Sequence, residues 1–185
     1  LYDARGSALF DEICELPEYY PTRTETAILG RCAAEIAQRA GPDCVLVEFG
    51  SGSSVKSRLL LDAMPDLDAY VPIDISREHL DETAARLRRD YPGLRVEPVC
   101  ADYMVLDGLP AFVNGARRIG FFPGSTIGNL TPEEATAFLR RARRLLRNDG
   151  ALILGVDLKK DPQILHDAYN DSAGVTAQFT LNLLR

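Results

Sequence analysis

From about residue 44 onward, short apolar runs alternate with stretches whose apolar residues recur at helical spacing. This alternation is typical of βαβ units, in which a helix connects each strand to the next parallel strand. Strands are expected at residues 44–49, 69–74, 96–101, 118–122 and 151–156. The pattern therefore predicts an α/β fold with a doubly wound, mainly parallel sheet of about five strands.

The second predicted strand contains a proline, Pro72. Proline has no backbone N–H, so it cannot donate to a neighbouring strand, whereas a central strand normally bonds to neighbours on both sides. We therefore expect this strand to be short, or to be paired on only one side at Pro72.

Several predicted helices begin at capping residues. Thr131 and Glu134 have the spacing of a capping box, with a proline between them at the first helical position. Thr22 and Glu25 repeat that spacing, which predicts a helix from there to about Ala40. Further helices are expected after the first strand, from about residue 76 to Tyr91, and from Asp161 onward. On the helix after the first strand, the predicted apolar side consists of Val55, Leu59, Leu60 and Ala63.

Length and charge narrow the classes of protein. A chain of 185 residues is large enough to bury roughly 70% of its unfolded surface in one domain. No apolar run approaches the ~20 residues that a membrane-spanning helix needs. The formal net charge of −6 disfavours broad adhesion to phosphate backbones or anionic membranes. Neither nucleic acid nor a membrane is therefore expected as a partner.

Cysteine spacing indicates reduced thiols. The chain has four cysteines and two histidines, without a CxxC motif, which argues against a zinc site, and no other metal is expected. A chain with an ample core does not need a disulfide framework, so we expect a cytoplasmic protein with free thiols. The sequence starts at Leu1 without an initiator Met and stops at Arg185 within an apolar pattern, from which we expect a fragment of a longer protein.

A glycine-rich turn follows the first predicted strand, in the sequence Gly50-Ser51-Gly52-Ser53-Ser54. Such a strand-to-helix turn lets the backbone approach a ligand and points helix N-terminal amides at it. The third glycine of GxGxxG is replaced by the bulky Val55, and the spacing is not that of a P-loop. The alternative is a tight turn that binds nothing.

Acidic residues follow the next two strands. Asp74, at the end of the second strand, has the place of a carboxylate that accepts both ribose hydroxyls of a nucleoside, or alternatively caps the helix that follows. Asp102 and Tyr103 follow the third strand and suit the amine and the ring face of an adenine. In isolation, that pair is more often part of an ordinary loop.

Two further positions suit a ligand with an amino-acid end group. Asn129, after the fourth strand, has both a donor and an acceptor with which to hold such a group, although it also suits a turn beside Gly128. Lys56 suits a ligand carboxylate near the glycine turn, but it is equally a solvated helix lysine. These positions remain ambiguous when each is considered alone.

Over residues 44–158, the order of these motifs resembles the class I S-adenosylmethionine (SAM)-dependent methyltransferases, which have a Rossmann-like fold. The finer resemblance extends over essentially the whole chain and is to the histidine-specific methyltransferases, which convert L-histidine to hercynine in ergothioneine biosynthesis. It rests on Tyr2-Asp3-Ala4-Arg5-Gly6-Ser7, Leu9-Phe10-Asp11, Leu16-Pro17-Glu18-Tyr19-Tyr20-Pro21-Thr22-Arg23-Thr24-Glu25, Gly124-Ser125-Thr126-Ile127-Gly128-Asn129-Leu130 and Ala168-Tyr169-Asn170-Asp171.

The resemblance implies a set of site residues. Cofactor contacts would be made by Gly50, Lys56, Asp74, Asp102 and Tyr103. The substrate pocket would be lined by Tyr2, Tyr19, Gly124, Asn129 and Tyr169. Of these, Tyr19 and Asn129 would have catalytic roles, Tyr19 by a hydrogen bond to the substrate amine and Asn129 by holding its head group.

The resemblance also implies a division of the chain. Residues 1–43 would form an N-terminal helical cap on the substrate pocket, and residues 44–185 a Rossmann-like SAM-binding domain. A C-terminal substrate domain and the last strands of the usual seven-stranded sheet lie outside these residues, so the fragment alone is expected to lack part of the substrate site.

Other functions stay open at this point. A methyltransferase of the same fold that acts on another amino acid or amine fits the motifs, as does a SAM-binding module without catalytic activity. An NAD-dependent oxidoreductase is the weakest alternative, because the third glycine of its fingerprint is absent.

Overall fold

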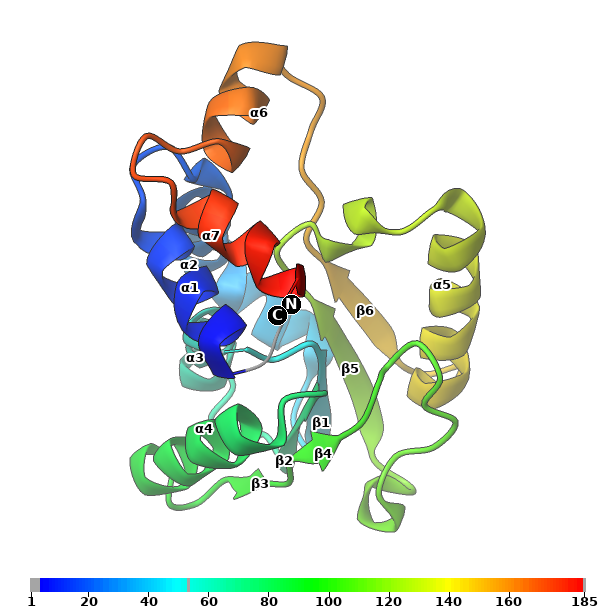
Figure 1. Ribbon diagram of the computed structural model, residues 1–185. Helices are drawn as coiled ribbons and strands as arrows, with labels where there is room; N and C mark the ends of the chain where they lie inside the picture. Colours follow the sequence, from blue (N-terminus) through cyan, green and yellow to red (C-terminus); the bar gives the residue numbers. More distant parts are fainter. Residues whose placement is uncertain (1–3, 53, 185) are drawn as a thin grey trace.

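The computed structural model describes residues 4–52 and 54–184 (Figure 1). Its strands are β1 (Cys44–Phe49), β2 (Ala69–Asp74), β3 (Arg95–Val96), β4 (Val99–Cys100), β5 (Arg117–Phe122) and β6 (Ala151–Leu154). They form one sheet in the order β3-β2-β1-β5-β6, with β4 also paired to β2. All of these pairs among the described residues are parallel. The predicted doubly wound α/β sheet is confirmed.

The third strand differs from the prediction. In place of one strand over 96–101, two short strands, β3 and β4, both pair with β2. Pro98 lies between them and has no N–H to continue the ladder. The last strand is also shorter than predicted, since β6 ends at Leu154.

The expectation for Pro72 is confirmed by this break. The carbonyl of Tyr70 accepts a hydrogen bond from the Glu97 N–H, and the carbonyl of Asp74 accepts one from the Ala101 N–H. Pro72 lies between these two bonds and pairs in register only with Glu48 of β1 on the other side. The strand thus remains central although its proline lacks a donor.

The helices are α1 (Ala4–Glu15), α2 (Tyr20–Ala40), α3 (Val55–Ala63), α4 (Arg77–Asp90), α5 (Pro132–Leu146), α6 (Pro162–Tyr169) and α7 (Val175–Leu181). The capping box of α5 is confirmed. The Thr131 hydroxyl accepts from the Glu134 N–H at 3.2 Å, and the Glu134 carboxylate accepts from the Thr131 N–H at 2.8 Å. At the start of α6, the Asp161 carboxylate accepts from the Gln163 N–H as expected.

The predicted capping box at Thr22 and Glu25 is wrong. Helix α2 begins earlier, at Tyr20, because Pro21 occupies its first turn, where a missing N–H breaks no helical hydrogen bond. Thr22 donates instead to the sulfur of Cys14 at 3.2 Å. The Glu25 carboxylate accepts from the backbone N–H of Gly124, far along the chain.

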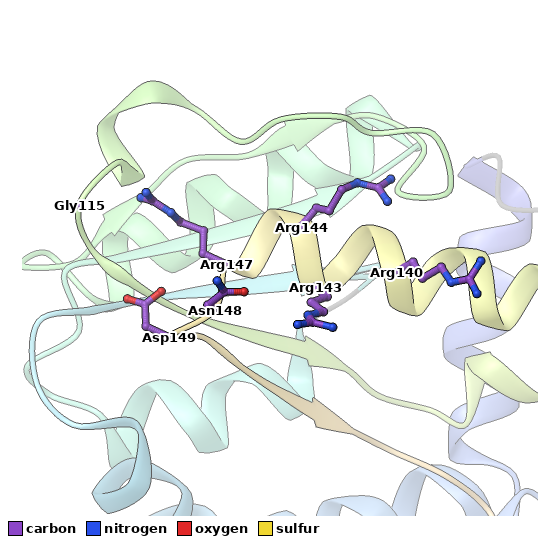
Figure 2. Close-up of a pocket in the computed structure, with 7 residues that line it drawn as sticks. All are labelled: Gly115, Arg140, Arg143, Arg144, Arg147, Asn148 and Asp149. Atoms are coloured by element: carbon purple, nitrogen blue, oxygen red, sulfur yellow. The ribbon is translucent and has the colours of Figure 1, made fainter.

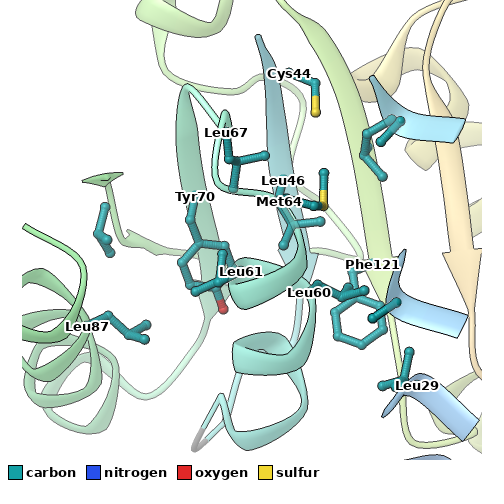
Figure 3. Close-up of a cluster of buried hydrophobic side chains, with 14 of the residues drawn as sticks. Leu29, Cys44, Leu46, Leu60, Leu61, Met64, Leu67, Tyr70, Leu87 and Phe121 are labelled. Atoms are coloured by element: carbon teal, nitrogen blue, oxygen red, sulfur yellow. The ribbon is translucent and has the colours of Figure 1, made fainter. Parts of the chain in front are cut away.

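Each face of the sheet has its own core. Helices α2, α3 and α4 cover one face, where Leu46, Tyr70 and Phe121 pack against Leu60 and their neighbours (Figure 3). On the other face, α5 and the irregular segment after β4 pack against the alternate strand residues. One detail of α3 was predicted wrongly. Val55 is 56% exposed, because the buried side of the helix is formed by Ser57, Leu60 and Leu61.

The strand order places a crevice between β1 and β5. From β1, the chain continues to β2 on one side, and it returns to β5 on the other. In open parallel sheets, ligands bind at the carboxyl ends of strands where the order reverses in this way. Gly50 follows β1 and Gly124 lies just after β5, so both glycine turns are at this position. No described helix is long and apolar enough to cross a membrane.

Candidate functional site

The glycine-rich turn after β1 has the backbone geometry that its sequence predicts. Gly50 and Gly52 have φ angles of +77° and +47°, which side chains rarely adopt. The N–H groups of Gly50 and Ser51 both donate to the carbonyl of Ile73, so the turn is held against β2. Within the described chain, the buried hydroxyl of Ser51 has no hydrogen-bond partner. A polar atom of this kind inside a cavity wall suits a ligand.

Asp74 is attached to the same turn. Its carboxylate accepts from the Gly52 N–H at 3.1 Å and from the Ser76 N–H at 3.0 Å. The alternative role of Asp74 as the helix cap is not found, because the N-cap of α4 is Ser76 and no side chain caps the helix. The bond to Gly52 connects β2 to the glycine turn. The carboxylate therefore lies beside the turn at the carboxyl edge of the sheet, where the prediction placed it.

Tyr103 packs directly against the turn. A Cβ added at Gly50 would lie 3.5 Å from Cε1 of Tyr103. The Tyr103 ring also packs edge-on against Phe122 and Phe138, with ring centroids 5.5 and 5.7 Å apart. Its neighbour Asp102 is exposed, and the carboxylate accepts from the Met104 N–H. An aromatic wall thus lies on one side of Gly50.

A cavity of about 330 Å³ opens beside the turn. Four of the predicted site residues line it together, namely Tyr19, Gly50, Lys56 and Gly124. Further lining residues are Phe10, Cys14, Thr22, Glu48, Ser51 and Thr126. The cavity lining does not include Asp74, Asp102, Tyr103, Asn129 or Tyr169. The structure therefore brings residues from α2, β1, α3 and the segment after β5 to one place.

The remaining predicted substrate residues lie nearby or at the surface. Tyr19 is buried, and its ring meets that of Tyr169 edge-on, with centroids 5.7 Å apart. Tyr169 itself is 54% exposed. Asn129 is exposed at the end of the short 3-10 helix Thr126–Asn129. Tyr2 lies outside the described residues.

Sequence reasoning missed Glu48, at the floor of the cavity. This residue of β1 is 2% exposed, and its carboxylate accepts hydrogen bonds from the hydroxyls of Ser57 and Tyr70. Burial raises the pKa of Glu48 to about 7, while the two hydroxyls and Lys56 act in the opposite direction. A glutamate within an otherwise apolar strand was the available signal, because such a residue needs partners when buried.

Sequence reasoning also assigned Glu25 the wrong role. Its carboxylate accepts from the Gly124 N–H at 2.9 and 2.8 Å, one contact to each oxygen. Lys56 donates to it at 2.5 Å, and both side chains are largely buried. Glu25 thus connects Lys56, a predicted cofactor-binding residue, to Gly124, a predicted residue of the substrate pocket.

A larger surface cavity, of about 830 Å³, lies elsewhere (Figure 2). Its lining includes four exposed arginines from α5 and the turn into β6, Arg140, Arg143, Arg144 and Arg147, together with Gly115, Asn148 and Asp149. Figure 2 shows these guanidinium groups pointing in different directions rather than toward one point. The turn precedes β6, so this hollow is at the amino end of that strand, away from the edge where parallel sheets bind ligands.

Residues 1–185 match the family described as histidine-specific, SAM-dependent methyltransferases. The chain is 47% identical over 186 residues to a histidine N-alpha-methyltransferase of Mycolicibacterium smegmatis. It is 35% identical over 193 residues to ergothioneine biosynthesis protein 1 of Neurospora crassa. These alignments cover 99% and 100% of this chain, but 57% and 22% of the relatives. The chain therefore spans little more than half the length of the first relative.

A solved structure from Methanococcus maripaludis, provisionally assigned as a SAM-dependent methyltransferase, has a similar fold. The TM-score is 0.58 at 17% identity, and the match covers 96% of this chain and 76% of the other. At this identity, the similarity concerns the fold alone. It agrees with the Rossmann-like architecture of the sheet.

Proposed function

The chain belongs to the family of histidine-specific, SAM-dependent methyltransferases, and we propose that it forms the SAM-binding part of an enzyme that methylates the α-amino group of L-histidine to hercynine. The observation that supports this most directly is the cavity of about 330 Å³. There, the glycine-rich turn and Lys56 on the cofactor side meet Gly124 and Tyr19 on the substrate side.

The residues around the turn fit the cofactor. Gly50 and Gly52 let the backbone approach a ligand, and the same cavity is lined by Ser51, whose buried hydroxyl has no hydrogen-bond partner among the described residues. In this proposal, Lys56 neutralises the carboxylate of the amino-acid end, and Asp74 accepts the ribose hydroxyls. Asp102 and Tyr103 hold the adenine by its amine and its ring face. When bound, SAM supplies a methyl group that its sulfonium has already activated.

On the substrate side, the protein's task is to orient an amine and to keep it unprotonated. We assign Tyr19 a hydrogen bond to the substrate amino group. Asn129 is assigned to hold the head group of the amino acid. Tyr169, in edge contact with Tyr19, and Tyr2 complete the aromatic lining with Gly124. Aromatic faces tolerate the positive charge that grows as methyl groups are added.

We further propose a division at residue 43, with residues 1–43 as a cap and 44–185 as the cofactor domain. In this proposal, a further domain of the longer protein completes the substrate site. The exposure of Tyr169 and Asn129 supports an open substrate side. Four free cysteines support a reducing compartment, and we place the protein in the cytoplasm.

Calorimetry with S-adenosylhomocysteine (SAH), followed by histidine, tests this function. We expect this chain to bind SAH, because the cofactor residues are all within it, and to bind histidine weakly or not at all. The full-length protein is expected to bind both. Failure of both proteins to bind SAH would contradict the proposal.

A methylation assay of the full-length protein with histidine and other amines, beside the calorimetry, separates the alternatives. If the full-length protein methylates another amino acid or amine in preference to histidine, the substrate assignment is wrong and the chemistry stands. If it binds SAH and methylates no amine, the chain belongs to a binding module. Because Tyr169 and Asn129 are exposed, the described residues do not enclose the substrate, and a different amine acceptor remains the second candidate.

Replacing Tyr19 by phenylalanine tests its assigned role. In the full-length protein, kcat/KM for histidine is expected to fall roughly tenfold, the effect of one lost hydrogen bond. SAH affinity should not change. Tyr91→Phe is the matched control, because Tyr91, just after α4, donates its hydroxyl to Asp62 of α3 and does not line the cavity. Unchanged histidine turnover in Tyr19→Phe would remove Tyr19 from the mechanism.

A further inference from the structure

Glu25 is paired with Lys56, the residue to which the proposed function assigns the ligand carboxylate. Lys56 lines the first cavity, Glu25 lines a second cavity of about 610 Å³ behind it, and Gly124 lines both. The Lys56 ammonium donates to Glu25 at 2.5 Å, and the two side chains are 17% and 16% exposed. The lysine is therefore already neutralised by an internal carboxylate.

The position of Glu25 is fixed by other contacts. Both of its oxygens accept from the Gly124 N–H. Gly155 lies close to both groups: a Cβ added there would be only 1.9 Å from the Glu25 Oε1 atom and 3.2 Å from the Gly124 nitrogen. A Cβ at Gly124 would in turn lie 3.6 Å from the Lys56 ammonium. The carboxylate is thus packed against Gly155 and hydrogen-bonded to Gly124 in addition to its contact with Lys56.

We infer that Glu25 is a built-in counter-anion that competes with the ligand carboxylate for Lys56 and thereby sets the affinity for carboxylate-bearing ligands. This inference rests on the proposed function, in which Lys56 receives the amino-acid carboxylate of the cofactor. A second carboxylate arriving at the same ammonium is repelled by the first, in a partly buried place where water screens the charges weakly. The repulsion applies to SAH as well as to SAM, so Glu25 lowers the affinity for both.

Glu25→Gln removes the charge and keeps an oxygen that accepts from the Gly124 N–H. Without the competing carboxylate, SAH is expected to bind about tenfold more tightly. 5′-Deoxy-5′-methylthioadenosine has the same nucleoside and thioether but no amino-acid end. Its affinity is expected to be unchanged, because no carboxylate reaches Lys56.

Calorimetry of both ligands with this chain tests the inference. The matched control is Glu35→Gln on the same helix, whose exposed carboxylate pairs with Arg39 on the surface. It should leave both affinities unchanged. If Glu25→Gln does not fold, Glu25→Asp is measured in the same way, since its shorter side chain draws the charge away from Lys56 and should also favour SAH selectively.

A gain in affinity that is restricted to SAH supports competition between Glu25 and the ligand carboxylate for Lys56. Equal gains for both ligands, or weaker binding of SAH with methylthioadenosine unaffected, would overturn it and leave the cofactor site itself intact. If the unaltered chain binds neither ligand, the proposed function fails as well, and the two failures are thereby distinguished.

Discussion

Asp74→Ala is expected to reduce the affinity of this chain for SAH by about a hundredfold or more, since each hydrogen bond to a charged acceptor contributes about 1.5–3 kcal/mol. Two losses combine in this variant. The ribose hydroxyls lose their proposed acceptor, and the Gly52 N–H loses the carboxylate that holds it at 3.1 Å. The glycine turn is then free to change shape at the place where the ligand approaches its backbone.

Asp74→Asn separates the two losses, because its amide oxygen still accepts from Gly52 but carries no charge. Asp68→Asn is the control, since Asp68 is exposed just before the amino end of the same strand. In calorimetry, the affinity for SAH should be highest and equal in the unaltered chain and Asp68→Asn. It should be lower in Asp74→Asn and lowest in Asp74→Ala. Retention of full affinity in Asp74→Ala would show that the nucleoside is held elsewhere.

The buried carboxyl of Glu48 is expected to make the stability of the fold depend on pH. Its pKa is raised to about 7 from an ordinary value of 4.5, chiefly by burial. In the folded chain, Glu48 therefore keeps its proton over a range in which the unfolded chain has lost it. Its stabilising contribution is fully present below about pH 4.5 and is lost as the pH rises through about 7. The total effect is about 3 kcal/mol.

The groups around Glu48 determine the direction of this effect. The hydroxyls of Ser57 and Tyr70 bond to the carboxylate, and Lys56 attracts it, so all three favour ionisation. Asp74 opposes ionisation, as does burial, which is the largest influence. Because burial exceeds the favourable contacts, the proton is held more tightly in the folded chain.

Denaturant titrations at pH 5 and pH 8 test this expectation. The unfolding free energy of the unaltered chain should fall relative to that of Glu48→Gln by about 2.5 kcal/mol between these values, because part of the total is already lost at pH 5. The unfolding free energy of Glu35→Gln should change with pH in the same way as that of the unaltered chain, because the Glu35 side chain is exposed on α2. A constant difference between the unaltered chain and Glu48→Gln across this range would show that Glu48 does not titrate there.

Much of the fold follows from local sequence patterns. The apolar runs predicted the sheet, and the residues around Thr131 predicted the start of α5 down to its hydrogen bonds. Such features depend on side chains within a few positions of each other, so sequence reasoning identifies them. The break at Pro98 has an equally local cause, but the prediction of one strand over 96–101 did not take this proline into account.

For the site, the sequence by itself determined which turns lie at the ligand edge, because parallel strands end there in sequence order. Gly50, Lys56, Gly124 and Tyr19 were predicted and share one cavity. The tertiary structure alone decided the roles of Glu25 and Glu48. Glu25 has the spacing of a helix cap, yet its partner Gly124 is 99 residues away. Capping depends on the nearest backbone groups, whereas this pairing exists only once packing of α2 on the sheet has buried the carboxylate and left it Gly124 and Lys56 as partners.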